Sequence, residues 1–180
     1  MARNRNSLLL YDGPNVQGTA DIIVIASAFN QRSVNGKTLD RIEVWIMYRD
    51  EAPTEAVRSG NDSAVCGECF LRPIIAKQLQ ELGESSIPCY VDKYRGPGGA
   101  WDSWHRGNIA SATPREASAI IASLRSCDCD ANHNRANCPN PGKPLGIRLG
   151  AYGDPASVPP WVWRDLLSML SSKMTSYTHQ

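Results

Sequence analysis

Two short segments rich in β-branched residues constrain the fold more than any other feature. Residues 21–28 (DIIVIASA) form a short apolar run, which is typical of a strand buried on both faces. Residues 41–47 alternate, with Ile42, Val44 and Ile46 on one face, and are predicted to form a second strand. A sheet with a buried centre is therefore expected.

Helix start and stop signals surround these strands. Four helices are predicted: one capped by Thr54 and ending at Gly60, then 73–82 with Gly83 just past its end, 113–124, and 160–169. The third is the clearest, because Thr113, Pro114 and Glu116 form a capping box with proline at N1. Further strands are predicted at 88–91 and 145–149.

The alternation of strands and helices predicts an α/β fold. We expect a single layered domain over residues 1–180 with a mostly parallel sheet, of which a partial barrel is one form. There are too few strands for a complete eight-fold barrel. A polar, Cys-rich loop insertion is expected at about 127–144, and residues 171–180 are expected to pair with no further element.

Charge and hydropathy restrict the setting. The 19 Lys and Arg residues nearly balance 18 Asp and Glu, so no overall field draws the chain to nucleic acid or acidic lipid. The apolar run after the basic start, Leu8 to Leu10, is too short for a signal peptide, and no other run could span a bilayer. We therefore expect a cytoplasmic protein, in the host cytoplasm if it is phage-encoded. Its six cysteines are then ligands or nucleophiles, with three disulfides as the alternative in an oxidising compartment.

Three cysteines form the strongest candidate site. Cys66-Gly-Glu-Cys69 has the spacing of a metal knuckle, and Cys89 follows in Pro-Cys-Tyr. Thiolates favour Zn²⁺ or an iron–sulfur cluster. The fourth position could be taken by His105, His179 or another cysteine, or stay open. A redox dithiol and buried free thiols are the alternatives.

A second group of soft ligands lies in the predicted loop: Cys127, Cys129, His133 and Cys138. Their spacing matches the zinc knuckle of nucleic-acid-binding proteins only in its last step, and the glycine and aromatic residue of that motif are absent. This group is either a small zinc site or a solvated surface insertion.

Residues 90–107 mix cations with aromatic rings, as a phosphate backbone and an unstacked base would require. The glycines of 96–99 allow a sharp, phosphate-binding turn, but the Walker Lys-Ser/Thr pair is missing, so an NTPase is not expected. The alternative is that Trp101 and Trp104, three apart on a helix, belong to the core.

The predicted strand at 145–149 runs into Gly-Asp-Pro. Ligands of parallel α/β proteins bind outside the carboxyl ends of strands, so Arg148, Tyr152 and Asp154 lie where function is expected. Arg148 could hold a phosphate or carboxylate, and Asp154 could act as a base or ligand. Alternatively, Asp154 caps the turn that begins at Pro155.

Five blocks together give the chain a resemblance to a family of uncharacterised phage and mobile-element proteins. They are Gly-Lys-Thr at 36–38, Cys-Gly-Glu-Cys at 66–69, Cys-Tyr-Val at 89–91, Arg-Leu-Gly-Ala-Tyr-Gly-Asp-Pro at 148–155 and Tyr-Thr-His-Gln at 177–180. The resemblance implies a phage or plasmid setting and a nucleic-acid-related role without an established reaction. The resemblance also implies a further α/β segment past the last block in family members, so this chain is either a naturally short form or a truncated member.

We therefore expect a metal-binding protein, an enzyme acting on a nucleotide or nucleic acid. The alternative is a non-catalytic zinc-stabilised module that binds nucleic acid or protein; no membrane partner is expected. The predicted ligands of zinc or an iron–sulfur cluster are Cys66, Cys69, Cys89 and His179. The predicted substrate-binding residues are Arg95, Arg106, Arg148 and Tyr152, and the predicted catalytic residues are Asp154 and His105.

Overall fold

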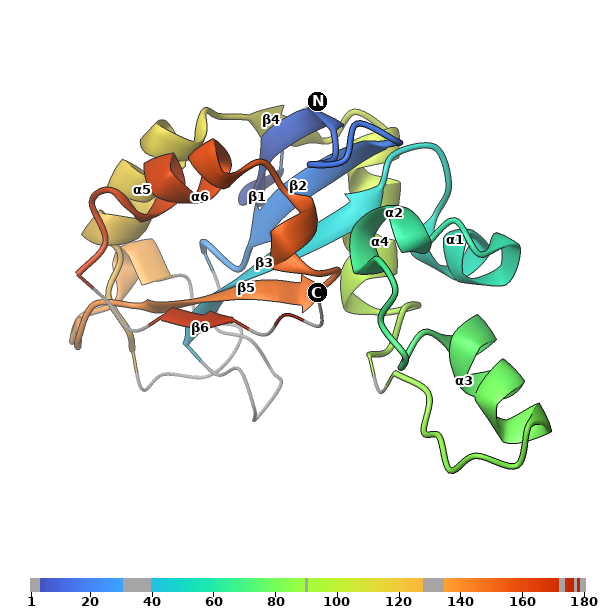
Figure 1. The fold of residues 1–180 in the computed structure, drawn as a ribbon. Coiled ribbons are helices and arrows are strands. Elements are labelled where there is room, and N and C mark those ends of the chain that lie inside the picture. The colour runs from blue at the N-terminus through green and yellow to red at the C-terminus, as the bar shows by residue number, and fades with distance from the viewer. Residues whose placement is uncertain are drawn as a thin grey trace.

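The computed structural model describes residues 4–30, 40–89, 91–127, 135–171, 174–176 and 178. Among them, six strands form one sheet in the order β4-β1-β2-β3-β5-β6 (Figure 1). The strands are β1 (Asn4–Pro14), β2 (Asp21–Ser27), β3 (Arg41–Tyr48), β4 (Ile109–Ser111), β5 (Gly146–Tyr152) and β6 (Met174–Ser176).

The sheet is mixed. β1, β2 and β3 are antiparallel neighbours, whereas β4 on β1, β5 on β3 and β6 on β5 are parallel pairs. The antiparallel centre follows from the short connection between β1 and β2, since only antiparallel strands can be joined by a tight turn. That turn is closed by a hydrogen bond from Asn15 N–H to Ala20 O of 2.8 Å. The α/β prediction is confirmed, but the sheet does not close on itself, so a partial barrel is not confirmed.

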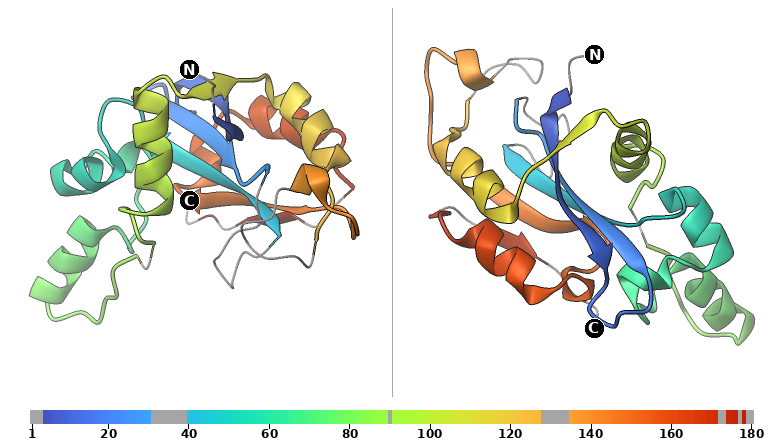
Figure 2. Two further views of the ribbon diagram at one scale, coloured as in Figure 1. Left: turned by 180° about the vertical axis from the view of Figure 1, so that it is seen from behind. Right: turned by 90° about the horizontal axis from the view of Figure 1, so that it is seen from above.

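Helices flank both sides of the sheet. α5 (Pro114–Ser123) and α6 (Pro160–Leu167) pack side by side at one side, and α1 (Pro53–Ser59), α2 (Ser63–Cys66) and α4 (Gly96–His105) lie at the other (Figure 2). α3 (Pro73–Glu81) projects away from the sheet (Figure 1). Two short 3₁₀ helices, η1 (Arg135–Asn137) and η2 (Pro155–Ser157), complete the described elements.

The predicted helices form close to their expected positions. In α5, Thr113 Oγ1 accepts from Glu116 N–H and the Glu116 carboxylate accepts from Thr113 N–H, which completes the capping box. The predicted cap of α1 is wrong: Ala52, not Thr54, is its N-cap residue, because Pro53 takes the first helical position.

Two strand predictions need correction. Pro88, Cys89 and Val91 lie in no strand. The tail, expected to pair with nothing, instead forms β6, whose Met174 pairs with Ile147 of β5. The physical reason is that the outer edge of β5 presents unpaired N–H and C=O groups, which a short terminal segment can satisfy.

The core is centred on β2 and β3, where Ile22 to Ala26, Ile42, Val44, Ile46 and Met47 are inaccessible to solvent. Helices on both sides explain why β2 is apolar throughout and does not alternate. Helices of the described part of the chain are too short or too polar to cross a bilayer.

Candidate functional site

A cavity of about 260 Å³ lies at the carboxyl end of β5. Its walls come from α1, the segment around α2, the start of α3, the segment 89–93 and the end of β5. The polar and sulfur-bearing residues of the lining are Asp62, Cys66, Cys69, Arg72, Cys89, Lys93, Arg148, Tyr152 and Asp154. The structure thus brings six of the ten predicted site residues to one cavity.

The Cys66–Cys69 segment forms a tight turn after α2. Cys66 is the last residue of the helix, Gly67 follows with φ 54°, and Cys69 N–H donates to Cys66 O at 3.1 Å. The left-handed φ explains why glycine stands between the two cysteines. The turn directs both cysteine side chains to the lining of the same cavity.

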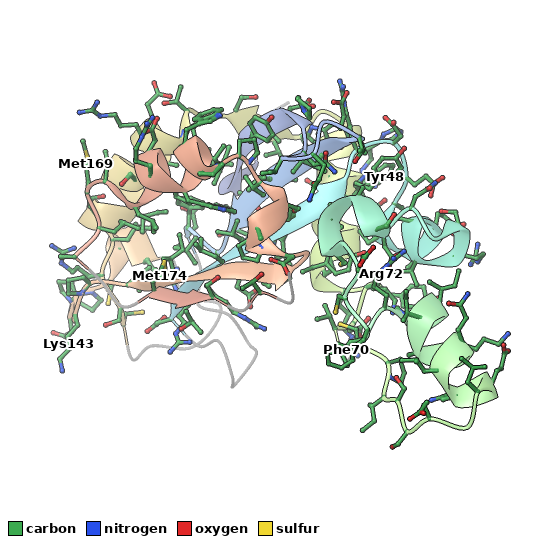
Figure 3. All side chains as sticks on the ribbon, in the orientation of Figure 1. Tyr48, Phe70, Arg72, Lys143, Met169 and Met174 are labelled. Carbon is green, nitrogen blue, oxygen red and sulfur yellow. The ribbon has the colours of Figure 1, made fainter. Side chains whose placement is uncertain are left out.

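Cys89 reaches the cavity from the far side of a projecting arm. The chain leaves the body near Phe70 and Arg72, runs through α3, and returns at Cys89, whose N–H donates to Leu71 O at 2.7 Å (Figure 3). We call residues 70–88 the α3 arm. The cysteines therefore lie at its base, where its two ends meet.

A buried ion pair braces this base. Arg72 donates from Nη2 and Nε to Asp62 Oδ1, at 2.7 and 3.0 Å. The same guanidinium donates to Gly67 O at 3.1 Å and Gly60 O at 2.7 Å. One cation thus fixes the loop before α2 and the turn after it. Buried charges persist only when they are paired and hydrogen-bonded in this way.

The environment of Cys66 favours a neutral thiol. Burial raises the pKa of the Cys66 thiol far above its ordinary value, and the nearby Asp62, Cys89 and Cys69 raise it further, while Arg72 lowers it. A metal ion bound here would have to displace the proton, because the thiolate is the ligand form.

Cys66, Cys69 and Cys89 do not have the geometry of a metal centre in this structure. Among the described residues, no three His, Cys, Asp or Glu side chains are arranged so that they could hold an ion. His179, the predicted fourth ligand, lies outside the described residues. Thr178 precedes it in sequence, and Thr178 Oγ1 donates to Asp154 Oδ2 at 3.0 Å. The described chain therefore reaches the border of the cavity one residue before His179.

The end of β5 is shaped by two glycines. Gly150 and Gly153 have φ of 65° and 77°, and a Cβ at either would meet backbone or proline atoms at 2.4–2.7 Å. Asp154 follows as the N-cap of η2, and its Oδ1 accepts from Ala156 N–H at 2.8 Å. The capping interpretation of Asp154 therefore describes its geometry, and a catalytic role stays a prediction.

The Gly96–Gly99 segment is helical and not the sharp loop that was predicted. It forms the first turn of α4, and the glycine at 96 is needed because a Cβ there would lie 2.6 Å from Trp45 Cη2. Trp101 and Trp104 pack against the core, and Trp101 Nε1–H donates to Tyr48 O at 3.1 Å. The core interpretation of the two tryptophans is thus confirmed.

The remaining predicted cations lie apart from the cavity lining. His105 is exposed and stacks on Trp101, with ring centroids 4.7 Å apart. Arg106 is exposed, and Arg95 pairs in solvent with Asp92 at 3.4 Å. The structure therefore does not bring His105, Arg95 and Arg106 to the site with the cysteines.

The second cysteine group is only partly described. Cys127 is buried and Cys138 half-buried, whereas Cys129 and His133 lie outside the described residues. Arg135 anchors this segment: its side chain is 1% exposed and donates to Asp40 Oδ1 at 3.0 Å. A second metal site here stays a prediction.

Sequence reasoning missed two polar residues of the cavity, Asp62 and Arg72, and included Lys93 only among the cations of residues 90–107. No sequence signal pairs the first two, because Asp62 stands four residues before Cys66 and Arg72 three residues after Cys69. No protein-family model, no curated protein and no solved structure matches the chain.

Proposed function

We propose that the cavity at the end of β5 is a metal-dependent site acting on a nucleotide or nucleic acid. The observation that carries the proposal is that Cys66, Cys69 and Cys89, from two separate segments, line the same cavity as Arg148 and Tyr152. The resemblance to phage and mobile-element proteins supports a phage or plasmid origin, but it does not indicate a reaction.

The proposed cofactor is zinc, with an iron–sulfur cluster as the other form. Three thiolates suit both, and His179 or a ligand atom would supply the fourth position. Bound zinc would act as a Lewis acid or lower the pKa of a water. The proposal requires the three thiols to converge from their places in the cavity wall. The turn at Gly67 and the return of the α3 arm at Cys89 are the parts of the chain that would adjust.

The chain's own residues would bind and orient the substrate. Arg148 and Lys93 line the cavity, and Arg72 is paired there with Asp62. Arginine and lysine side chains form strong charge-assisted hydrogen bonds with phosphate groups. Asp154 is the proposed base. His105, Arg95 and Arg106 could contact only a substrate that extends past the cavity.

A second candidate function is favoured by the place of the cysteines at the base of the α3 arm. A metal there would join the arm's two ends, as in a structural zinc site. The arm exposes apolar side chains, including Phe70 (57%), Leu82 (78%) and Ile87 (76%). Under this alternative the chain is a zinc-stabilised module that binds protein or nucleic acid and catalyses nothing.

Anaerobic purification followed by metal analysis and an absorption spectrum tests the metal site. About one zinc per chain, or iron with sulfide and a brown colour, is expected. Serine variants of Cys66, Cys69 and Cys89 should each lose that metal. Cys138→Ser, in the second cysteine group and outside the cavity, should keep the metal of the cavity and reports separately on a second site. Metal-free protein from both aerobic and anaerobic preparations would defeat the proposal.

Asp154→Asn separates the two candidate functions. An amide oxygen can still cap η2, so the fold and the metal content should persist. An enzyme should lose turnover of its nucleotide, whereas a binding module should keep its affinity. Binding of nucleic acid should weaken steeply with salt, and a flat salt response would argue against it.

A further inference from the structure

The hydroxyl of Tyr152 is buried without a partner. Tyr152 is the last residue of β5, it is 5% exposed, and no described residue forms a hydrogen bond with its hydroxyl. Buried polar groups are almost always satisfied, so an unsatisfied one needs a reason. Tyr152 also lines the cavity, which makes a bound molecule the natural partner.

The neighbours of this hydroxyl place it at the cysteine end of the cavity. Burial raises the pKa of Tyr152 far above its ordinary value, and nearby Cys66, Asp62 and Cys89 raise it further, against the opposing effect of Arg72. All four neighbours line the cavity as well. A phenol hydroxyl is a hydrogen-bond donor, so Tyr152 can donate a hydrogen bond into the cavity.

The size and lining of the cavity limit the ligand. Pockets that bind small molecules measure about 300–1,000 Å³, so a cavity of about 260 Å³ suits one small molecule. Val57, Leu71 and Val91 give it apolar walls, and Lys93 and Arg148 add cations.

We infer that the cavity binds a single mononucleotide: its base accepts a hydrogen bond from Tyr152, and its phosphate faces Lys93 and Arg148. The apolar walls suit the flat base. A nucleic-acid strand would not be enclosed. The inference rests on the proposed function, which gives nucleotides as the ligand class. It adds that the ligand is a single mononucleotide and that Tyr152 binds its base.

The test uses the full chain with its metal content measured, uridine 5′-monophosphate as probe, and Tyr152→Phe. Tyr94→Phe is the matched control, because Tyr94 is 77% exposed and lies outside the cavity lining. Calorimetry should show about tenfold weaker binding for Tyr152→Phe and no change for Tyr94→Phe. The thermal midpoint of the ligand-free protein should not fall in Tyr152→Phe, because no internal hydrogen bond is lost.

Three results would overturn the inference. A lower midpoint in ligand-free Tyr152→Phe would mean that the hydroxyl serves the fold. Equal affinity of wild type and Tyr152→Phe for uridine 5′-monophosphate would contradict the hydrogen bond from Tyr152. No binding of this probe at all would contradict mononucleotide binding. Tighter binding of a ten-residue oligouridylate than of the monophosphate would make the site a strand site. The metal content of the same protein tests the proposed metal site independently of these three results.

Discussion

The Arg72 guanidinium donates two hydrogen bonds to the same oxygen of Asp62, at 2.7 and 3.0 Å, with 9% and 2% of the two side chains exposed. The pair joins the loop before α2 to the start of the α3 arm. It therefore sets the distance between the Cys66–Cys69 turn and the point where Cys89 returns.

Arg72→Met should strongly destabilise the protein. Methionine keeps much of the volume but leaves the Asp62 carboxylate buried without its cation, which typically costs about 3–5 kcal/mol. The free energy of unfolding from urea titration measures the loss. Arg95→Met is the control, because its pair with Asp92 is 90% exposed on the arginine side and should contribute less than about 1 kcal/mol. Similar losses in both variants would contradict the bracing role of Arg72.

The Cys66 thiol of the metal-free protein should react slowly with alkylating agents. Its pKa is raised, so at pH 8 it carries less thiolate than an ordinary cysteine, and the thiolate is the reactive form. Peptide mapping after iodoacetamide treatment should show faster labelling of Cys66 once the chain is unfolded in urea. Equal labelling rates in folded and unfolded protein would contradict this.

The same shift predicts a loss of stability in alkali. The folded state holds the Cys66 proton more tightly than the unfolded state, so its contribution is complete below the thiol's ordinary pKa of 9.0. It is lost as the pH rises above that value. Unfolding curves of metal-free wild type should therefore weaken above pH 9 more than those of Cys66→Ser. Parallel pH profiles would show that Cys66 does not titrate differently on folding.

The sequence predicted those strands and helices that carry a strong local signal. β2 and β3 were predicted because β-branched runs report burial directly, and α5 because its capping box is complete within four residues. β1 was missed, since its polar first residues hide the apolar Leu8–Leu10. The Gly96–Gly99 turn was misassigned because glycine fits a tight loop and a close approach to Trp45 equally well.

The site was predictable in its chemistry but not in its assembly. Residue types and strand-end logic indicated Cys66, Cys89 and Tyr152 as candidates, and all three line one cavity. The Asp62–Arg72 pair could not be predicted, because two charges ten residues apart meet only through the path of the chain between them. His105 was grouped with the cysteines on residue type alone, whereas its stacking on Trp101 depends on the helical spacing of α4.

Glu116 should stabilise α5 in a pH-dependent way. The Thr113 backbone N–H, and then its hydroxyl, hold the pKa of the Glu116 carboxyl below its ordinary value. A lowered folded-state pKa gives a contribution that is present above the unfolded value of 4.5 and lost as the pH falls. The difference in melting temperature between wild type and Glu116→Ala should therefore shrink below pH 4.5. Arg115→Ala, on the same exposed turn, should show no such trend; a difference independent of pH would contradict the capping role.

Gly153→Ala tests whether the loop after β5 tolerates any side chain. Gly153 has φ 77°, and a Cβ there would lie 2.4 Å from Ile46 O, a backbone atom that cannot move without shifting β3. Gly18→Ala is the matched control, because Gly18 has φ 69° with no atom within 4 Å of the added carbon. The control should lose only the left-handed strain, about 1–2 kcal/mol. Gly153→Ala should lose clearly more and should also weaken metal and nucleotide binding, because Tyr152 and Asp154 flank the position. Equal losses in the two variants would show that the loop can move away from β3, and that the cavity wall at this end is not fixed by Gly153.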